Sequence, residues 1–539
     1  MKKAVRPLTW GPVVTAWGLF LVHAYRVYGT DVGLIDDAFI FFRYARHWAN
    51  GQGLVWNIGG PRVEGVSSLL YTALLTLGAR AGLDLITWAT GLNLILALLT
   101  LYLLVRYTEK VTQDWMPPEQ RSRVLWVPPL LLALAPMWAF WTDTGMDTVL
   151  LTGLMLLAGW TLLNAYTQAR GGTHATYPWV LTGLVFALLG MARLDTVPLF
   201  LYTLGVVFLW PPRPDTRSRA LRGMVIGFLG AFLPFYLARW WYFGWPLPNT
   251  FYAKMGGGVL AWVEGLRYVL AFLTYPGMWV LAVLAVIGYV AFPRWPVGYT
   301  AGWVGLLLVR AVAAGGDWMP HFRMMVPALP GLTVLASLGL WALLERWLTP
   351  VRRTWAGVIV GLLALVVAWP SLLYVAQHPY RLWRPLRLVE PMHASQYAMG
   401  LALREHVCPE DRIALIAAGA AAYLNDDHII IDMLGLNDIH TAHTQPVLYK
   451  GRWDSGHVRL DVDYLLALRP EWIQLDTHLF PTPEYHLRDW MPPQVLWTDP
   501  RIRALYDLYP LRVQVPTDFP RPRVGYIFFL HRKDARVCP

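Results

Sequence analysis

Long apolar stretches follow one another through residues 1–375, whereas residues 376–539 lack them. A helix needs about 20 mostly apolar residues to cross roughly 30 Å of hydrocarbon, and most of these stretches come close to that length. We therefore expect a polytopic α-helical membrane module with about eleven spans. The spans are predicted at residues 8–27, 86–106, 124–141, 146–166, 177–191, 195–210, 222–243, 268–292, 298–314, 326–347 and 355–375.

Residues 376–539 have a different pattern, with dense charge and many prolines. Short β-like runs stand at residues 412–416 and 428–431, within a more polar background. Short runs of this kind between helical segments are typical of an α/β domain. The chain is thus expected to have two domains, a membrane module over 1–375 and a water-soluble α/β domain over 376–539.

The segment 66–82 decides the topology, because it is apolar but interrupted by Gly78, Arg80 and Gly82. If it crossed the membrane, the next loop and its basic residues would lie outside, against the positive-inside rule. If it lies along the outer interface as an amphipathic helix, the basic loops that follow face the cytoplasm. Residues 28–85 then form the first external loop, and the C-terminal domain is extracytoplasmic.

Composition agrees with a membrane protein, since 56% of the residues are hydrophobic and only 15% are charged. The net charge of +11 comes from basic residues spread over many short loops, which favours topology as its cause and argues against nucleic-acid binding. Lys2, Lys3 and Arg6 precede the first apolar segment, which has no convincing small-residue cleavage site. We expect an uncleaved anchor with a cytoplasmic N-terminus in the cell membrane.

Two adjacent carboxylates, Asp36 and Asp37, open the first external loop. Acids at the edge of a bilayer are costly to desolvate, so their presence needs a reason. Neighbouring carboxylates raise one another's proton affinity, and partial burial does the same, so one of them can act as a general base on a sugar hydroxyl. The alternative is a helix cap, because a helix over about 37–49 has free N–H groups that an Asp side chain accepts well.

Several motifs along the chain carry a family resemblance. The loop reads DDAFIFFRYARHWANGQGLVWNIGGPRVEG, and WTDTGMDT, MARLDT, PLPNTFYAK, GGDWMPHFRMMVPALP and IDMLGLND follow it. Together they resemble the GT-C glycosyltransferases that use polyprenyl-phosphate sugars, and among them the arabinofuranosyltransferases that add terminal residues to the mycobacterial wall. The resemblance runs over nearly the whole chain. It implies a GT-C-type fold, a polyprenyl-phosphate sugar donor, a cell-envelope glycan or glycolipid acceptor, and Asp36 as the favoured base.

Two positions depart from the family pattern. Arg193-Leu194-Asp195 stands where relatives tend to have Arg-Pro-Asp or Arg-Pro-Glu, and Asp147 stands where Glu is common. Both departures keep the charge. The identity of the transferred sugar stays undecided, because relatives with this pattern need not all use arabinose.

Basic residues gather at the predicted outer ends of spans and in the external loops, where a departing phosphate would need positive charge. Arginine offers phosphate two aligned donors, whereas lysine offers a mobile point charge. The alternative for each residue is interfacial snorkelling, and for Arg323 it is also a salt bridge to Asp317. The candidate phosphate-binding residues are Arg323, His321, Lys254, Arg310 and Arg239.

Other polar residues near the same face are candidate substrate contacts. Their alternatives are structural ion pairs, such as Arg193 with Asp195 or Asp147, and a plain loop around the prolines of PLPNTFYAK. The candidate substrate-binding residues are Asp195, Arg193, Asn249, Tyr252, Glu64 and Asp317.

In the C-terminal domain, the runs 432–438 and 454–457 are candidates for an acceptor surface over the membrane cavity. The alternative for the first is a turn with Gly435 in a left-handed conformation and with Asn437 or Asp438 as a helix cap.

The sequence carries no specific metal signal, because its 14 histidines show no HExxH or other paired-ligand spacing. Carboxylates beside a phosphate still leave room for a divalent cation near Asp36 or Asp37. Cys408 and Cys538 both lie in the external domain, where oxidation is permitted, and their pairing stays open.

Two other classes of function compete with the transferase. A transporter or flippase for a lipid-linked or polar solute would show internal repeats and charged or broken spans near the bilayer midplane. The chain shows no clear repeat, and its conspicuous charges cluster at one outer face. A non-catalytic assembly or sensor protein explains the architecture but not the paired acids. We therefore favour a transferase that inverts the anomeric carbon in a single displacement.

Overall fold

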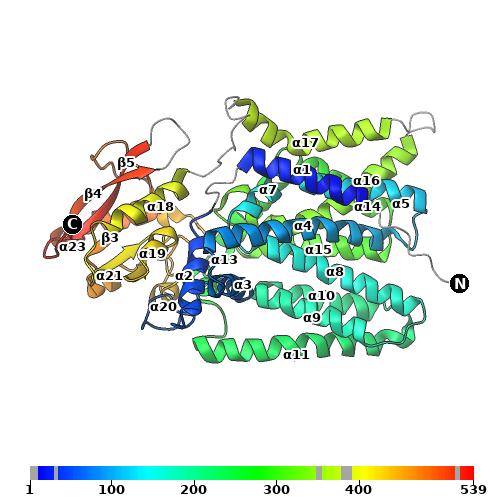
Figure 1. The fold of residues 1–539 in the computed structure, drawn as a ribbon, viewed down its shortest axis with the longest axis horizontal. Helices are drawn as coiled ribbons and strands as arrows, with labels where there is room; N and C mark the ends of the chain where they lie inside the picture. Colours follow the sequence, from blue (N-terminus) through cyan, green and yellow to red (C-terminus); the bar gives the residue numbers. More distant parts are fainter. Residues whose placement is uncertain (1–9, 29–33, 348–354, 378–390, 516–522, 539) are drawn as a thin grey trace.

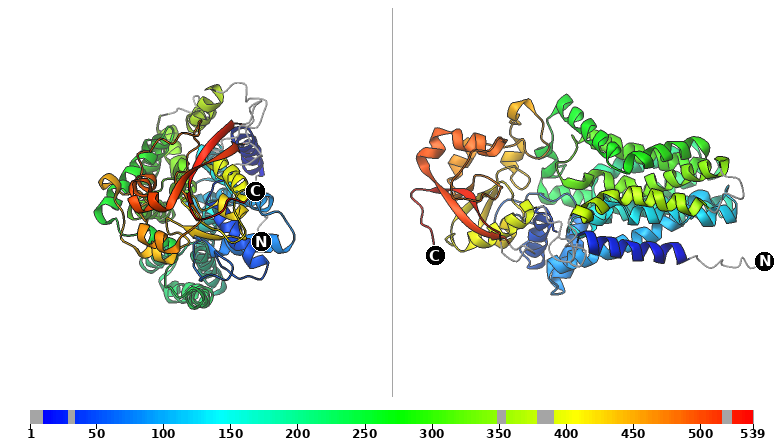
Figure 2. Two further views of the ribbon diagram at one scale, coloured as in Figure 1. Left: turned by 90° about the vertical axis from the view of Figure 1, so that its left-hand side faces the viewer. Right: turned by 90° about the horizontal axis from the view of Figure 1, so that it is seen from above.

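The computed structural model describes residues 10–28, 34–347, 355–377, 391–515 and 523–538. Long helices form a bundle, and an α/β domain is attached to one end of that bundle (Figure 1). Helix α1 begins at the end of the bundle far from this domain and runs toward it, as the view from above shows (Figure 2).

The bundle consists mainly of apolar helices that run side by side. These are α1 (Trp10–Tyr28), α4 (Leu85–Thr112), α6 (Val127–Ala133), α7 (Pro136–Asp143), α8 (Thr148–Arg170), α9 (Tyr177–Ala192), α10 (Val197–Leu209), α11 (Arg217–Phe243), α13 (Gly258–Thr274), α14 (Met278–Ala291), α15 (Trp295–Ala313), α16 (Leu329–Trp347) and α17 (Trp355–Gln377). Short elements connect them, namely α5 (Pro118–Val124), η1 (Leu194–Thr196), η2 (Pro214–Thr216), α12 (Asn249–Lys254) and η3 (Pro320–Ala328).

Within the described residues, six helices are long and apolar enough to cross a membrane, and eight if each of two bent pairs counts as one span. The chain is therefore a multi-pass membrane protein. The other five predicted spans coincide with shorter apolar helices or with parts of the bent pairs, so the count of eleven stays a prediction. The six are Leu85–Thr112, Thr148–Arg170, Pro214–Phe243, Trp295–Ala313, Pro320–Arg346 and Ala356–Leu373.

The span predicted at 268–292 is broken in the structure. Helix α13 ends at Thr274, α14 begins at Met278, and the two are bent by 89°. Pro276 cannot continue a helical hydrogen-bond ladder, and Gly277 takes a φ of +86°, which residues with a side chain rarely adopt. The segment therefore turns at Tyr275-Pro276-Gly277 instead of crossing as one straight helix.

Two short helices of the loop that was predicted to be external, α2 (Ala38–Ala49) and α3 (Leu69–Arg80), lie where the bundle meets the α/β domain (Figures 1 and 2). Helix α2 runs across the direction of the long helices. Helix α3 has 12 residues, and its N-terminus is capped by Ser68, which accepts a hydrogen bond from the Tyr71 N–H. At 1.5 Å per residue α3 is about 18 Å long, which is too short to cross the hydrocarbon.

The C-terminal domain contains a five-stranded sheet with the order β2-β1-β3-β5-β4. Its strands are β1 (Arg412–Leu415), β2 (Ile429–Asp432), β3 (Trp472–Gln474), β4 (Tyr506–Val515) and β5 (Arg523–Arg532). The first three neighbours pair in parallel, and β5 pairs antiparallel with β3 and β4. Both predicted β-runs, 412–416 and 428–431, are strands of this sheet. The helices around it are α18 (Pro391–Arg404), α19 (Ala420–Leu424), α20 (Ile439–His443), α21 (Val462–Leu468), α22 (Met491–Thr498) and α23 (Pro500–Leu505).

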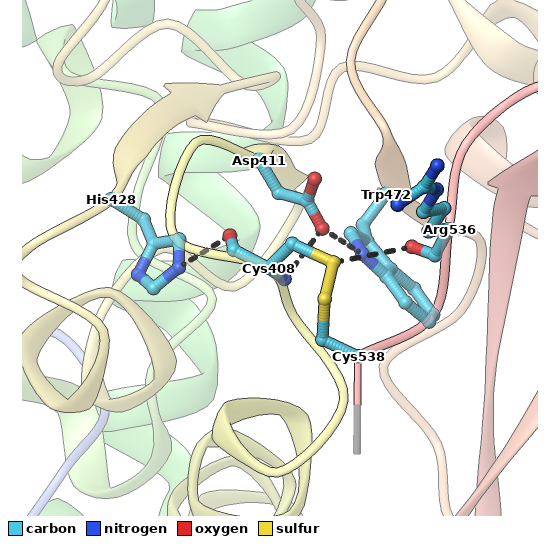
Figure 3. Close-up of a disulfide and its surroundings, with 6 residues drawn as sticks. All are labelled: Cys408, Asp411, His428, Trp472, Arg536 and Cys538. Atoms are coloured by element: carbon cyan, nitrogen blue, oxygen red, sulfur yellow. Dashed lines mark hydrogen bonds between the residues drawn. A yellow bond between two sulfur atoms is a disulfide. The ribbon is translucent and has the colours of Figure 1, made fainter.

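Cys408 and Cys538 form a disulfide that joins the C-terminal segment to the loop before β1 (Figure 3). Asp411 lies beside this disulfide. Its carboxylate accepts hydrogen bonds from the Cys408 N–H at 2.9 Å and from the indole of Trp472 at 2.9 Å. The pairing that the sequence left open is thus present.

Candidate active site

A cavity of 580 Å³ lies where the bundle meets the C-terminal domain. Its wall is built from α2, from the N-terminus of α8, from the segment around η1, from α12 and from the C-terminal end of α15 and the loop after it. Two residues of the C-terminal domain, Leu436 and Ser455, complete the wall. The cavity therefore needs both domains.

Charged side chains of both signs line this cavity. The acids are Asp37, Asp147, Asp195 and Asp317, and the bases are Arg193, Lys254, Arg310 and Arg323. The number of positive charges equals the number of carboxylates, so the wall can accept a phosphate anion only where a cation is not already neutralised by its neighbour.

Asp195 holds two of the arginines. It accepts from Arg193 Nε and Nη2, both at 3.2 Å, and from Arg310 Nε at 2.8 Å. Arg193 also lies 3.9 Å from Asp147. The structural pairing of Arg193 with both acids, foreseen as an alternative, is present. These contacts hold Arg193, Asp195 and Arg310 together on the cavity wall.

Arg323 forms an ion pair with Asp317, with its Nε 2.7 Å from Oδ2. This pair was the predicted alternative for Arg323. Both partners also line the cavity, so the pair does not remove Arg323 from the wall. Asp317 accepts on one edge of the guanidinium and leaves the other nitrogen atoms of the fork for a ligand.

Asp37 lies at the N-terminus of α2 with its side chain on the cavity wall. Its carboxylate makes no capping bond to α2, and within the described part of the chain it makes no hydrogen bond or ion pair. Burial raises its pKa from the ordinary value, and the nearby charges of Arg323 and Lys254 oppose that rise. An acid that is half-buried, faces a cavity and has no hydrogen-bonded partner among the described residues is suited to take a proton.

Asp36 points away from Asp37, into the interface with the C-terminal domain. It is 4% exposed, and its two oxygens accept from the N–H groups of Gly419 at 3.0 Å and Ala420 at 2.8 Å. It therefore caps the N-terminus of α19, and not the helix over 37–49 that was the alternative to a catalytic role. Burial raises the pKa of Asp36 to about 7. A Cβ at Gly419 would lie 2.0 Å from the Asp36 carbonyl oxygen, so this contact requires glycine.

The architecture of both domains matches solved structures of known proteins. ArnT from Cupriavidus metallidurans, solved with undecaprenyl phosphate, is 14% identical with a TM-score of 0.54, and the match covers 96% of this chain and 98% of that one. The Archaeoglobus fulgidus oligosaccharyltransferase AglB, solved with an inhibitory peptide and a dolichol-phosphate, is 10% identical with a TM-score of 0.53 over 87% and 69%. The mycobacterial arabinofuranosyltransferase AftD is 16% identical with a TM-score of 0.52 over 97% and 42%, so this chain spans less than half of AftD.

The chain has the GT-C glycosyltransferase fold. Residues 386–518 match a domain of unknown function, DUF8728. A search of curated protein sequences finds no match. The predicted resemblance to GT-C enzymes is thereby confirmed at the level of the fold.

Two predicted site residues, Glu64 and Arg239, lie together but away from the cavity wall. They form a buried ion pair, and Arg239 also donates to the carbonyl oxygens of Trp245 at 3.3 Å and Pro246 at 2.8 Å. Burial raises the pKa of Glu64 to about 7, and the hydrogen bond from Arg239 opposes the rise. The pair joins the segment between α2 and α3 to α11, which is a structural role rather than substrate contact.

Three more predicted residues lie behind the wall. The ring of His321 packs on Phe140 with 4.5 Å between ring centroids. Asn249 donates from Nδ2 to carbonyl oxygens of the segment 435–438 at 2.8 to 3.2 Å. Tyr252 packs on His443, again at 4.5 Å. The structure therefore brings Asp37, Arg193, Asp195, Lys254, Arg310, Asp317 and Arg323 to the cavity and leaves Asp36, Glu64, Arg239, Asn249, Tyr252 and His321 in supporting positions.

The motif at 432–438 forms the turn that was the alternative to an acceptor surface. Gly435 has a φ of +82°, and Asp438 caps α20 by accepting from the Thr441 N–H at 2.8 Å. Leu436 of this turn lines the cavity. No group of three or more His, Cys, Asp or Glu side chains with metal-binding geometry occurs in the ranges that the structure describes.

Two buried arginines that were not predicted from the sequence join the domains. Arg43 of α2 donates to the carbonyl oxygens of Trp56 at 2.7 Å and His428 at 3.2 Å. Arg459, from the C-terminal domain, donates to backbone carbonyls around α12. Arg43 interrupts the aromatic run FIFFRYA, and a charge on such an apolar face was the available signal. Arg459 has no comparable signal.

Proposed function

We propose that this chain is a glycosyltransferase that transfers a sugar from a polyprenyl-phosphate donor to a glycan or glycolipid acceptor outside the cytoplasm. The observation that carries the proposal is the carboxylate of Asp37, which faces a cavity lined by Lys254 and three arginines and has no hydrogen-bonded partner in the described chain. The fold supports it, because its solved examples include proteins determined with undecaprenyl phosphate and with dolichol-phosphate.

The transfer is a single displacement at the anomeric carbon. The acceptor oxygen attacks that carbon, Asp37 takes the hydroxyl proton, and the bond between the anomeric carbon and the phosphate oxygen breaks. The electron pair of that bond stays on the phosphate, where the wall cations stabilise it. A phosphate is a weak base, so no protein acid is required, and the anomeric configuration is inverted.

Among the wall cations, Lys254 is the one without a carboxylate partner, since no described residue forms a hydrogen bond or ion pair with its Nζ. Burial lowers the pKa of Lys254, and the neighbouring charge of Arg323 acts in the same direction. A phosphate beside Nζ would favour the charged form. Arg310 contributes as well, because its Nη1 lacks a hydrogen-bond partner among the described groups.

The cavity also has an apolar side that reaches the outer surface of the bundle. Phe251, Met255 and Val309 line the cavity and are 41%, 45% and 63% exposed. Apolar side chains exposed on a membrane bundle face lipid. This side suits an isoprenoid tail that enters from the bilayer while its phosphate stays at the cations.

We propose the outer leaflet of the cell membrane as the place of the reaction, with the beginning of α1 on the cytoplasmic side. The disulfide of the C-terminal domain supports this orientation. The likeness to AftD supports arabinofuranose as the first sugar to test. A divalent cation at Asp37 is a further part of the proposal that metal addition to the assay would examine.

The test is a panel of radiolabelled polyprenyl-phosphate sugars offered to the purified protein in detergent with cell-envelope glycan and glycolipid acceptors. We expect label to pass from one donor to an acceptor, and the arabinofuranosyl donor is the first candidate. Transfer from no donor, together with translocation of an intact lipid-linked sugar in vesicles, would instead support the transporter hypothesis.

The pH dependence of transfer is expected to report on Asp37. Burial raises the pKa of this carboxyl, while Arg323 and Lys254 oppose the rise. Because a general base must be deprotonated, kcat/KM should rise with pH through this pKa and fall below it. Lys254→Met removes one opposing charge, so the acid limb should move to higher pH. A limb that stays in place in this variant would contradict Asp37 as the titrating group.

A further inference from the structure

The segment Trp453–Arg459 of the C-terminal domain lies against the cavity, and we call it the strap. Trp453 is 4% exposed and fills the space beside Gly257 and Gly315. A Cβ at either glycine would come within 2.4 Å or 2.9 Å of the indole, so both positions require glycine. Ser455, further along the strap, lines the cavity. The strap is thus anchored in the membrane module beside the candidate donor site.

Arg459 ends the strap and binds only backbone oxygens. It is 6% exposed, and no carboxylate of the described chain pairs with it. Its guanidinium donates to the carbonyl oxygens of Tyr252 at 3.2 Å, Ala253 at 3.4 Å, Met255 and Thr444. Three of these four carbonyls belong to the last turn of α12 and to the residue after it.

Helix α12 needs such support, because it has six residues. Isolated helices of this length are not stable in water, and the last carbonyls of a helix have no partner within it. A buried cation satisfies these carbonyls and complements the helix dipole. At the other end of α12, Asn249 donates to carbonyls of the segment 435–438. The C-terminal domain therefore holds both ends of α12.

Lys254 is the last residue of α12 and lies between two of the carbonyls that Arg459 binds. Its alkyl stem lies against the strap, because a Cβ at Gly456 would be 3.5 Å from Lys254 Cε. Its side chain lines the cavity. The direction of Lys254 is thus set by the backbone that Arg459 holds and by the strap that covers its stem.

We propose that Arg459 is a positioning residue of the donor site, which fixes the end of α12 so that Lys254 faces the phosphate of a polyprenyl phosphate. This rests on the proposed function. It gives the domain that matches DUF8728 an indirect part in donor binding, through a residue that positions Lys254 and does not itself touch the donor.

The test is the affinity of the full-length protein in detergent for undecaprenyl phosphate, measured for wild type, Lys254→Met, Arg459→Met and the double variant. Each single variant is expected to bind about tenfold more weakly or worse, because a charge-assisted hydrogen bond to the phosphate is lost or misplaced. The double variant should bind no more weakly than Lys254→Met, since Arg459 acts through Lys254. Arg452→Met, at an exposed neighbouring position, is the matched control and should bind as wild type does.

Arg459→Lys keeps the charge and most of the volume but not the planar fork, so its affinity should lie between wild type and Arg459→Met. This variant keeps the test decisive if Arg459→Met does not fold. Additive losses in the double variant, or unchanged affinity in both Arg459 variants while Lys254→Met is weak, would overturn the inference alone. A wild-type protein that does not bind polyprenyl phosphate would overturn both the proposed function and this inference.

Discussion

Asp37→Asn is expected to lower the rate of sugar transfer by about 10²- to 10⁴-fold, the usual contribution of a positioned general base. Asparagine keeps the shape of the side chain but cannot take a proton from the acceptor hydroxyl. The side chain lies on the cavity wall without a hydrogen-bonded partner among the described residues, so the substitution leaves no buried donor or acceptor unpaired. Transfer rates and the affinity for polyprenyl phosphate should be measured on the same preparation. Affinity should be unchanged or tighter, because a negative charge near the phosphate is removed.

Asp36→Asn is the matched comparison for this result. Both oxygens of Asp36 accept from backbone N–H groups, so an asparagine would place its amide nitrogen against one of these donors. The loss should appear mainly as reduced thermal stability, of about 1–3 kcal/mol for an unsatisfied buried group. Activity per folded molecule should fall far less than in Asp37→Asn. The reverse order of the two activities would assign the base to Asp36, as the family resemblance first favoured.

Arg239→Met is expected to destabilise the protein by about 3–5 kcal/mol, the usual result of leaving one partner of a buried ion pair alone. Arg239 is 4% exposed and Glu64 is 5% exposed, so neither can turn to water. The substitution also removes two hydrogen bonds to backbone carbonyls of the loop that follows α11. Thermal unfolding in detergent, followed by tryptophan fluorescence, would measure the loss.

The control for this prediction is the surface ion pair of Arg267 with Glu264, in which the arginine side chain is 69% exposed. Arg267→Met should cost less than about 1 kcal/mol, because water replaces the lost partner. The double variant Glu64→Met with Arg239→Met should recover most of the stability, since no charge is then buried alone. Equal effects of Arg239→Met and Arg267→Met would show that the buried pair is not a structural support.

The membrane module could be predicted from the sequence because its signals are local. Apolar length and the distribution of basic residues mark the helices, and the proline and glycine of Tyr275-Pro276-Gly277 were available as a sign of the break in the span at 268–292. The strands over 412–416 and 428–431 were likewise readable from short apolar runs. The pairing of Cys408 with Cys538 could not be read, because it depends on how two segments 130 residues apart approach each other.

The different positions of Asp36 and Asp37 could not be predicted from the sequence either, because they also depend on contacts between distant segments. The partners of Asp36 are N–H groups 383 and 384 residues away, and no periodicity around residue 36 predicts them. Glu64 and Arg239 are a second example. From the sequence, each was a candidate for binding substrate or phosphate, but in the structure the two side chains pair with each other. Charged residues at a membrane surface are recognisable from sequence, but whether they face a ligand or each other depends on tertiary packing.

Transfer by this protein is best measured in proteoliposomes that contain a radiolabelled polyprenyl-phosphate sugar and an acceptor. Wild type is expected to form labelled acceptor and free polyprenyl phosphate in equal amounts, and Asp37→Asn to form neither while it still binds the lipid phosphate. Label that remains on its lipid and crosses the bilayer, or full transfer by Asp37→Asn, would contradict the account.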